Sequence, residues 1–302
     1  MTDLAGAPTA QDLADRTGYD PAFLGVDVPM PTVRTGPPTV VLPYLHYSVV
    51  FRPDRRFAAL TALDLDGRLL RSLPRRDTWQ LDPRLAPELQ AGPPVYASND
   101  LDRGHLVMRA SSTWGATEAE AKQAEADTFY FSNAAPQAAR FNQGRELWLG
   151  LEEHLQEHAA GFDRKLVVFA GPVLDPADPP YRGIQVPLRF WKVVGFVQDG
   201  ALAATGYLLD QTPLVDDLGA AFADAVAAGA VPPLGPFRTF QVPIADIAAL
   251  TGVAFDQLAL VDRLGAPVAG AAPPPGQVST GWKELSSFDD VILASRGTPH
   301  DG

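Results

Sequence analysis

The chain has 302 residues, of which 46% are hydrophobic and 20% charged, enough for a buried core of normal size. It has no cysteine, which excludes disulfides, iron–sulfur clusters, cysteine-ligated zinc and a cysteine nucleophile. The formal net charge of −12 argues against a nucleic-acid partner, but residues 68–145 carry ten Lys and Arg side chains against nine Asp and Glu. Charge alone therefore decides nothing about partners.

The first residues, MTDLAGAPTAQDLADR, show no basic stretch followed by an apolar one, so we expect no secretory signal. No apolar stretch reaches the ~18–20 residues that are needed to cross a bilayer. We therefore expect a soluble protein without membrane contact, either cytoplasmic or exported without a signal peptide.

Composition predicts three regions along the chain. Residues 1–38 are rich in Pro, Gly and Ala and are expected to form an irregular arm. Residues 39–264 are expected to form one domain, and residues 265–302 a linker followed by a segment that docks on that domain. The docking side chains expected there are Trp282, Leu285, Phe288 and Ile292.

Two strands are predicted near the start of the domain. Aromatic and β-branched residues predict a strand over 44–51, and a turn over 53–55 leads to a second strand over 57–65. Five prolines between residues 71 and 96 predict that this stretch is mostly loop. His46 falls on the first strand, where a hydrogen-bonded core or sheet residue is the expected role rather than a ligand.

A helix and a short strand are predicted next. Thr117 and Glu120 form a capping-box pattern, which predicts a helix over 118–127. The apolar run TFYFS over 128–132 predicts a strand. A longer helix is expected after Asn142, because apolar residues recur there at helical spacing.

The second half is predicted to mix strands and helices irregularly. The expected strands cover 165–170, 190–197, 203–209 and 240–243. The expected helices cover 216–228 and 244–250, and Gly252 is expected to end the second one. Because strands and helices do not alternate one by one, α+β fits better than doubly wound α/β.

A short segment around His105 carries the first chemical signal. Asp102 and Arg103 precede the histidine, and Gly104 is expected to let the backbone turn sharply just before it. A neutral imidazole beside a guanidinium suits a general base that acts on an anionic substrate, since the cation attracts the anion and disfavours protonation of the ring. A structural turn with a surface salt bridge is the alternative.

A cluster of amide side chains follows. Asn133, Gln137 and Asn142 lie at the entry to the predicted long helix, where neutral oxygen ligands could hold a hard cation. Mg²⁺ needs few protein ligands because it keeps several waters and binds substrate phosphates. Asn142 is also suited to cap the helix, and both roles can hold at once.

Three motifs together resemble a known family. They are Asp-Arg-Gly-His at 102–105, Ser-Asn-x-x-Pro-Gln at 132–137 and Asn-Gln-Gly at 142–144. In order and approximate spacing they are similar to the DNA/RNA non-specific endonucleases, the group of mitochondrial endonuclease G and of secreted bacterial sugar-non-specific nucleases. Weaker likeness extends from about Gly18 to about Leu260. The resemblance implies a ββα-metal (His-Me finger) nuclease fold on a mixed, largely antiparallel sheet with flanking helices.

The resemblance also implies an activity, the metal-dependent hydrolysis of phosphodiester bonds in DNA, RNA or both. His105 would be the general base that activates water, and Asn142 the single direct protein ligand of Mg²⁺, with Mn²⁺ as a substitute. Arg103 would stabilise the phosphorane charge. Glu152 would hold metal-bound water, and Glu146 is its alternative because Glu152 lies ten positions after Asn142.

The remaining site positions carry over from the same family pattern. Asn133 resembles an asparagine that lines the pocket, and Asp102 and Gln137 are placed beside it. An upstream arginine also belongs to the family site. Arg76 is the chosen residue and Arg75 its rival, because both lie shortly before Trp79.

Other interpretations of the sequence stay open. His154-Leu155-Gln156-Glu157-His158 matches the H-x-x-E-H pattern of zinc peptidases, although a solvated helix end is the alternative. A catalytically silent nucleic-acid-binding or interaction module on the nuclease fold is another. Trp79, Trp148 and Trp191 are expected in the core rather than as platforms for base stacking.

The expected partner is DNA or RNA. A nuclease without a signal peptide would damage its own cell, so we hypothesise that an inhibitor or another regulatory partner, an activating ligand, or an export route restrains it. The preference between DNA and RNA and the formation of a homodimer are left open.

Overall fold

The computed structural model describes residues 8–74, 78–138, 165–213, 218–235, 238–265, 277–279 and 281–285. Several predictions lie outside these residues and are not tested by the structure. They concern the long helix after Asn142 and the residues Arg75, Arg76, Glu146, Trp148, Glu152, His154, His158, Phe288 and Ile292.

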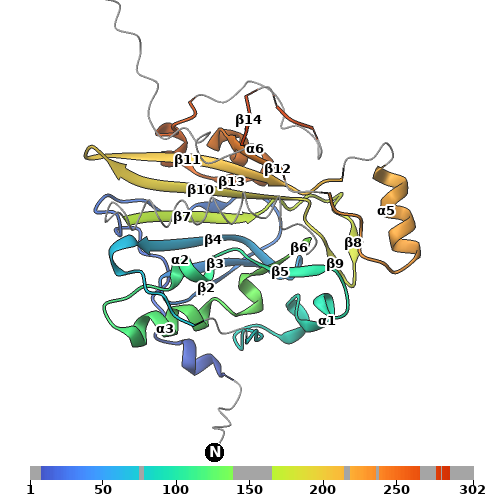
Figure 1. The fold of residues 1–302 in the computed structure, drawn as a ribbon, viewed down its shortest axis with the longest axis horizontal. Coiled ribbons are helices and arrows are strands. Elements are labelled where there is room, and N and C mark those ends of the chain that lie inside the picture. Colours follow the sequence, from blue (N-terminus) through green and yellow to red (C-terminus); the bar gives the residue numbers. More distant parts are fainter. Residues whose placement is uncertain are drawn as a thin grey trace, which may run out of the picture.

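An eight-stranded sheet, antiparallel throughout, forms the body of the molecule (Figure 1). Its strand order is β14-β12-β11-β10-β7-β4-β3-β2. The strands are β2 (Val40–Pro43), β3 (Tyr47–Arg52), β4 (Phe57–Asp66), β7 (Lys165–Pro172), β10 (Arg189–Gln198), β11 (Ala201–Asp210), β12 (Arg238–Val242) and β14 (Lys283–Glu284). The central strands are buried on both faces, which explains their long apolar runs.

Three two-stranded ladders accompany the sheet. They are β1 (Thr32–Val33) with β13 (Val253–Ala254), β5 (Leu101–His105) with β6 (Ala134–Ala138), and β8 (Pro180–Tyr181) with β9 (Ile184–Gln185). The α-helices are α1 (Pro93–Tyr96), α2 (Arg109–Ser112), α3 (Glu118–Asp127), α5 (Leu218–Ala227), α6 (Ile244–Thr251) and α7 (Asp256–Leu260). The 3-10 helices are η1 (Ala10–Leu13), η2 (Gly67–Leu69), η3 (Pro87–Leu89) and η4 (Phe131–Asn133). Within the described ranges, no helix combines the length and the apolar character that a bilayer crossing requires.

Side chains on the two faces of the sheet belong to two different cores. One core contains Tyr47, Leu63 and Val168 from the sheet together with Leu106 and Val107, which follow β5. The other contains sheet residues such as Phe169 and Trp191 together with Tyr19, Val28, Ile247 and Leu258. The segment that carries the Asp-Arg-Gly-His motif therefore packs on one face, and the segment with Tyr19 and Val28 packs with α6 and α7 on the other.

Most of the predicted elements within the described ranges are confirmed. Helix α3 begins and ends as predicted, and Thr117 Oγ1 accepts a hydrogen bond from the Glu120 amide at 3.2 Å. Gly252 ends α6 with a left-handed φ of 67°. Near the end of the described chain, Trp282 and Leu285 are buried at 7% and 4% exposure and flank β14. The three-region division stays a prediction.

Two predictions about strands are wrong. Residues 128–132 do not form a strand, because the aromatic run turns into η4 and the strand follows at Ala134–Ala138. His46 does not lie on a strand, since β3 begins only at Tyr47. His46 instead adopts a left-handed φ of 72° in the preceding turn, where its ring stacks on Trp114 at 3.5 Å between ring centroids.

Candidate active site

The Asp-Arg-Gly-His motif lies on β5, which pairs with β6 in an antiparallel ladder. In this ladder Arg103 is opposite Pro136, and His105 is opposite Ala134. Alternate residues of a strand share a face, so Arg103 and His105 point to the same side. The small residue and the proline opposite them leave the space above this face to the arginine and the histidine.

Gly104 does not make the sharp turn that the sequence suggested. It lies within β5, and it is not among the glycines with a left-handed φ. A Cβ atom at this position would lie 2.1 Å from Cδ of Gln137. The glycine leaves room for the Gln137 carboxamide, and a larger residue here would have to displace that side chain.

Asn133 fixes the backbone that follows the histidine. Its side chain is fully buried, its Oδ1 accepts from the Val107 amide at 2.8 Å, and its Nδ2 donates to the Val107 carbonyl at 3.0 Å. The same Nδ2 donates to the Thr128 carbonyl at 3.0 Å, and the Asn133 carbonyl accepts from the Leu106 amide at 3.0 Å. These hydrogen bonds tie residues 106–107 to residues 128–133, and the two segments form one hydrogen-bonded frame.

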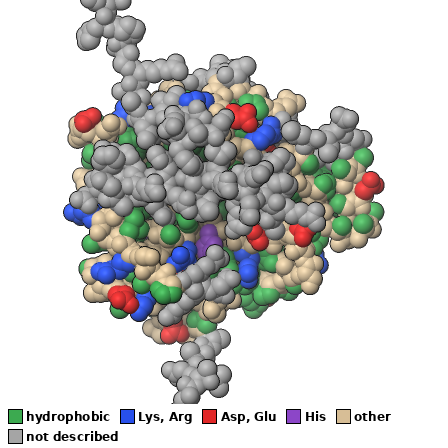
Figure 2. Space-filling model, viewed as in Figure 1, with side chains coloured by type: hydrophobic (Ala, Val, Ile, Leu, Met, Phe, Trp, Pro, Cys, Tyr) green, Lys and Arg blue, Asp and Glu red, His purple; other side chains and the backbone are tan. Residues whose placement is uncertain are grey.

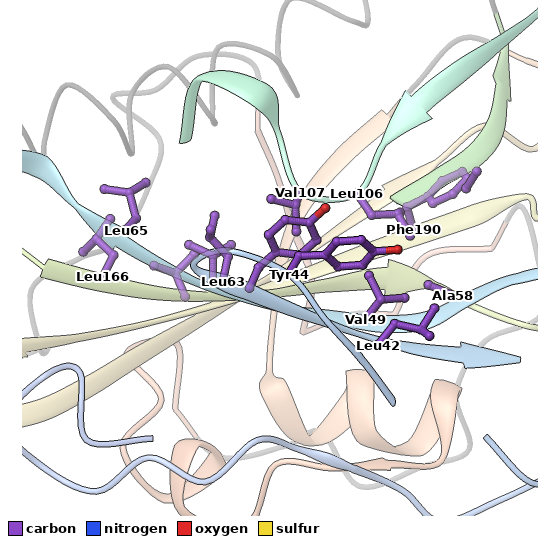
Figure 3. Close-up of a cluster of buried hydrophobic side chains, with 14 of the residues drawn as sticks. Leu42, Tyr44, Val49, Ala58, Leu63, Leu65, Leu106, Val107, Leu166 and Phe190 are labelled. Carbon is purple, nitrogen blue, oxygen red and sulfur yellow. The ribbon is translucent and has the colours of Figure 1, made fainter. Parts of the chain in front are cut away.

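Two apolar side chains anchor this frame to the sheet. Leu106 and Val107 are buried at 5% and 2% exposure and belong to the core that includes Tyr44 and Leu63. Figure 3 shows both side chains on the segment after β5, directed at the sheet residues. Because His105 immediately precedes these anchors, the position of its backbone is set by the core.

His105 is half-buried and lies among aromatic rings. The Trp79 ring centroid is 4.6 Å away at a tilt of 50°, and the Phe129 ring meets the imidazole edge-on at 5.2 Å. Cζ of Arg103, whose side chain is exposed, lies 5.5 Å from the Trp79 ring centroid. In Figure 2 a histidine side chain reaches the surface with Lys and Arg side chains near it.

A buried ion pair holds the chain shortly after Trp79. Asp82 is fully buried, and Arg84 donates to it from Nε and Nη2, the latter at 2.7 Å. The Tyr44 hydroxyl donates to the same carboxylate, and burial raises the pKa of Tyr44 well above its ordinary value. Arg84 also donates to the Pro43 carbonyl at 2.7 Å. The loop that carries Trp79 is thus attached to the edge of the large sheet.

The structure brings together five of the predicted site residues. Arg103 and His105 share one face of the β5–β6 ladder, and Asp102 and Gln137 are paired in register on the opposite face. The Asn133 side chain is buried next to the ladder, and its amide forms hydrogen bonds with backbone groups of Val107 and Thr128. The roles of these residues in a substrate pocket stay predictions.

The contact of Trp79 with His105 was not predicted from the sequence. Trp79 was expected in the core, but the structure leaves it half-buried against His105. Its position three residues before Asp82 was a usable signal, because the Asp82–Arg84 pair shows that this segment is held in place. Trp191, in contrast, is fully buried as expected.

The described residues offer few ligands for a metal ion. Within the ranges that the structure describes, no group of three or more His, Asp and Glu side chains lies together. A cation that keeps most of its water and binds phosphate oxygens needs only one or two protein oxygens, which suits the amide-rich motifs. The expected ligand Asn142 lies outside the described residues, so a magnesium site stays a prediction.

A comparison with models of protein families shows to which family the chain belongs. The model of the DNA/RNA non-specific endonucleases matches residues 30–262. The chain belongs to this family. Its members include the relatives that the motifs predicted, and the matched region contains the whole β5–β6 ladder.

Several known proteins are similar in sequence to this chain. The uncharacterized protein y4fB of Sinorhizobium fredii is 38% identical over 259 residues, covering 77% of this chain and 38% of that protein. Human mitochondrial endonuclease G is 33% identical over 81 residues, covering 27% of this chain and 24% of that protein. Bovine mitochondrial endonuclease G is 28% identical over 132 residues, covering 39% of this chain and 41% of that protein. The matches span less than half the length of each relative.

A solved structure shows the same fold. A chain in the crystal structure of the EndoG/EndoGI complex, which concerns the mechanism of EndoG inhibition, superposes with a TM-score of 0.53 at 21% identity. The match covers 75% of this chain and 90% of that chain. The α+β body with its large antiparallel sheet is therefore that of a ββα-metal nuclease, as the motifs predicted.

Proposed function

We propose that this protein is a metal-dependent endonuclease that hydrolyses phosphodiester bonds of DNA, RNA or both. Family membership supports a nuclease function in general terms. The observation that carries the finer proposal is the placement of His105. It lies half-buried at the end of β5, shares its face with an exposed arginine, and immediately precedes a segment that Asn133 and two core residues hold in place.

His105 acts as the general base in this proposal. In its neutral form the imidazole takes a proton from the attacking water, a contribution that is typically worth ~10²–10⁴-fold in rate. Arg103 lies on the same face and binds the phosphate, because a guanidinium recognises phosphate oxygens with two donors. Protonation of the imidazole would remove this base, so the activity is expected to fall in acid.

Mg²⁺ would be held by Asn142, with Mn²⁺ as a substitute. A bound divalent cation polarises the phosphate and stabilises the leaving oxygen. Glu152, or Glu146 in its place, would accept hydrogen bonds from water around the cation. All three residues lie outside the described part of the chain, and their roles rest on the motif at 142–144.

Capture of the substrate is assigned to arginines of the stretch from residue 68 to residue 145. Arg76, or Arg75, would bind a phosphate, and Asp102 and Gln137 would shape the ladder on which the site lies. The stretch from residue 68 to residue 145 is nearly balanced in charge within a chain of net charge −12. Because the rest of the chain repels a polyanion, we expect binding to depend strongly on these arginines and on salt concentration.

A partner that restrains the enzyme is part of the proposal. EndoG, whose structure is similar, was crystallised with EndoGI in a study of its inhibition. An inhibitor, a regulatory protein or a homodimer interface would serve the same purpose here. The chain can be expressed in the cytoplasm with and without its genomic neighbours. If host cells die quickly and equally in both cases, no such restraint exists.

The test is digestion of plasmid DNA and of structured RNA by the purified protein, with Mg²⁺, with Mn²⁺ and with EDTA. We expect cleavage that both metals support and EDTA abolishes. In Asn142→Ala the rate falls, and raising the Mg²⁺ concentration partly restores it, because the cation binds more weakly. In His105→Asn no metal concentration restores the rate.

Two results would contradict this function. Folded wild-type protein that binds nucleic acid but cleaves neither substrate with any metal would indicate a silent binding module. A single tightly bound Zn²⁺ that is lost in His154→Ala would favour the zinc-peptidase interpretation instead.

A further inference from the structure

Arg103 and His105 lie on one face of the β5–β6 ladder, called the motif face below. The indole of Trp79 contacts both of these side chains. Its ring centroid is 4.6 Å from the imidazole of His105 and 5.5 Å from Cζ of Arg103. Arg103 and His105 are two residues apart on β5, so their Cα atoms are separated by about 6.5 Å. One indole is large enough to reach both side chains across that interval.

Trp79 is itself held in the frame that carries the histidine. The Gln80 amide donates to the Phe129 carbonyl at 3.0 Å, and the Phe131 amide donates to the Gln80 carbonyl at 2.9 Å. The rings of Phe129 and Phe131 lie 5.5 and 5.6 Å from the indole. Both phenylalanines are 2% exposed, so they form a fixed floor under Trp79.

The same short segment leads directly into the frame of His105. Residues 131–133 form η4, and Asn133 at its end bonds to both backbone groups of Val107. The aromatic floor and the backbone after His105 are therefore parts of one hydrogen-bonded unit. A side chain that is fixed on this unit has a defined position relative to the imidazole.

The geometry limits how the imidazole can rotate. Trp79 borders it on one side at a tilt of 50°, and Phe129 meets it edge-on at 85°. Two rings at such angles leave few rotamers open to the histidine, and the indole face attracts the guanidinium of Arg103. The indole thus sets the distance between the side chain that takes a proton and the side chain that binds a phosphate.

We propose that Trp79 is the positioning residue of this site, which fixes His105 and Arg103 relative to each other on the motif face. It acts through these two side chains and touches no reacting atom. The inference rests on the proposed function, because it assigns Trp79 a part in the general-base step. A displacement of about 1 Å at a catalytic group can reduce a rate by ~10²-fold, so loss of the indole is expected to reduce turnover rather than binding.

The test compares Trp79→Ala, Trp79→Phe and Trp114→Phe in cleavage of a fluorescent DNA duplex with Mg²⁺. In Trp79→Ala we expect kcat to fall by roughly 10- to 100-fold, with KM within about threefold of the wild-type value. Trp79→Phe keeps an aromatic ring and is expected to recover most of kcat. Trp114→Phe is the matched control, because Trp114 stacks on His46, away from the motif face.

A second measurement does not depend on activity. The imidazole signals of the five histidines are recorded by NMR, and the signal of His105 is identified by its absence in His105→Asn. In Trp79→Ala this signal should move toward the position of a solvated histidine, because the ring current and the packing of the indole are lost. In Trp114→Phe it should stay, whereas the signal of His46 moves.

The outcomes separate the two proposals. If wild-type protein cleaves nothing, the proposed function fails, and the NMR signal alone then decides whether Trp79 positions the imidazole. Folded Trp79→Ala with the wild-type kcat overturns the positioning role. So does an unchanged His105 signal in that variant, or a loss of kcat that Trp79→Phe does not recover.

Discussion

Two histidines in this molecule lie against tryptophans, and their surroundings differ in every other respect. His46 is 7% exposed, its ring stacks on Trp114 at 17°, and its Nε2 lies 3.1 Å from the Trp114 carbonyl oxygen. His105 is half-buried, its ring is tilted by 50° against Trp79, and it shares a strand face with Arg103. Burial lowers the pKa of His46. It serves as a neutral packing group with a hydrogen bond to the backbone.

The comparison shows what distinguishes a structural histidine from a candidate base. The neighbours of His46 include the Trp114 carbonyl, the stacked Trp114 ring and, 3.9 Å from Nε2, the Glu120 carboxylate. The neighbours of His105 hold its backbone and border its ring, and the residue as a whole stays partly exposed although its Nε2 is buried. A proton acceptor needs a fixed position within reach of the substrate. Of these two histidines, only His105 lies on a partly exposed strand face beside an exposed arginine.

The same substitution at both histidines should separate the two roles most strongly. In His105→Asn we expect a loss of activity of ~10²–10⁴-fold with a free energy of unfolding within about 1 kcal/mol of the wild type. In His46→Asn we expect activity within about threefold of the wild type and a loss of about 1–2 kcal/mol in stability, because stacking and a hydrogen bond are lost. Asparagine suits the positive φ of His46.

Nuclease rates and urea denaturation of both variants make this measurement. The distinction between the two histidines fails if His46→Asn, once shown to be folded, loses activity as severely as His105→Asn does.

A substitution next to His105 should disturb the β5–β6 ladder without touching the region of His46. Gly104→Ala places a methyl group against the Gln137 carboxamide, where the closest atom would be 2.1 Å away. We expect a loss of about 1–3 kcal/mol in stability, together with reduced activity. The double variant Gly104→Ala/Gln137→Ala should recover most of the stability, because the clash is removed. Equal stabilities of the single and the double variant would refute the role assigned to this contact.

A smaller effect is expected from a buried carboxyl group beside His46. The Asp64 amide donates to the His46 carbonyl at 2.9 Å, and the Trp114 indole N–H donates to the Asp64 carbonyl at 2.8 Å. Burial raises the pKa of Asp64 from 3.8 to about 8. The folded state therefore keeps a proton that the unfolded chain releases, so stability decreases as the pH rises between these two values.

Asp64→Asn removes this titration. Its stability relative to the wild type should increase from pH 4.5 to pH 8.5 by on the order of 1 kcal/mol or more, measured by urea denaturation at each pH. Nuclease activity should not change, because Asp64 lies on the side of His46 and not of His105. A difference between the two proteins that is independent of pH would show that Asp64 is already ionised in the folded state.

Local signals in the sequence predicted local structure well. The capping-box pattern of Thr117 and Glu120 led to a predicted helix with the same bounds as α3. The apolar runs predicted β4, β7, β10 and β11 to within a few residues. The ladder of β5 and β6 was not predicted. Its two strands contain Arg, Asp, Gln and Pro instead of alternating apolar residues, and they pair across residues 106–133, so no pattern within either segment indicates the partner.

The site was predictable by motif but not by geometry. His105, Arg103 and Asn133 were chosen because their motifs resemble those of the family, whereas the reason for Gly104 lies in a contact with a side chain on another strand. The same holds for Trp79, whose contact with His105 depends on how residues 80 and 129–131 pair. Such contacts depend on tertiary structure, and a single sequence carries little sign of them.

The distance along the chain between β5 and β6 has a consequence for biosynthesis. At ordinary rates of translation, Ala134 follows His105 by about 2–6 s, and β7, which lies beside β4 in the sheet, is made later still. Until then the histidine has no opposing strand, no Asn133 behind it and no complete core beneath it. A nascent or prematurely terminated chain therefore contains the Asp-Arg-Gly-His motif without the arrangement around it. A ribosome that has not yet made β6 and β7, surrounded by its own RNA, therefore carries no assembled site.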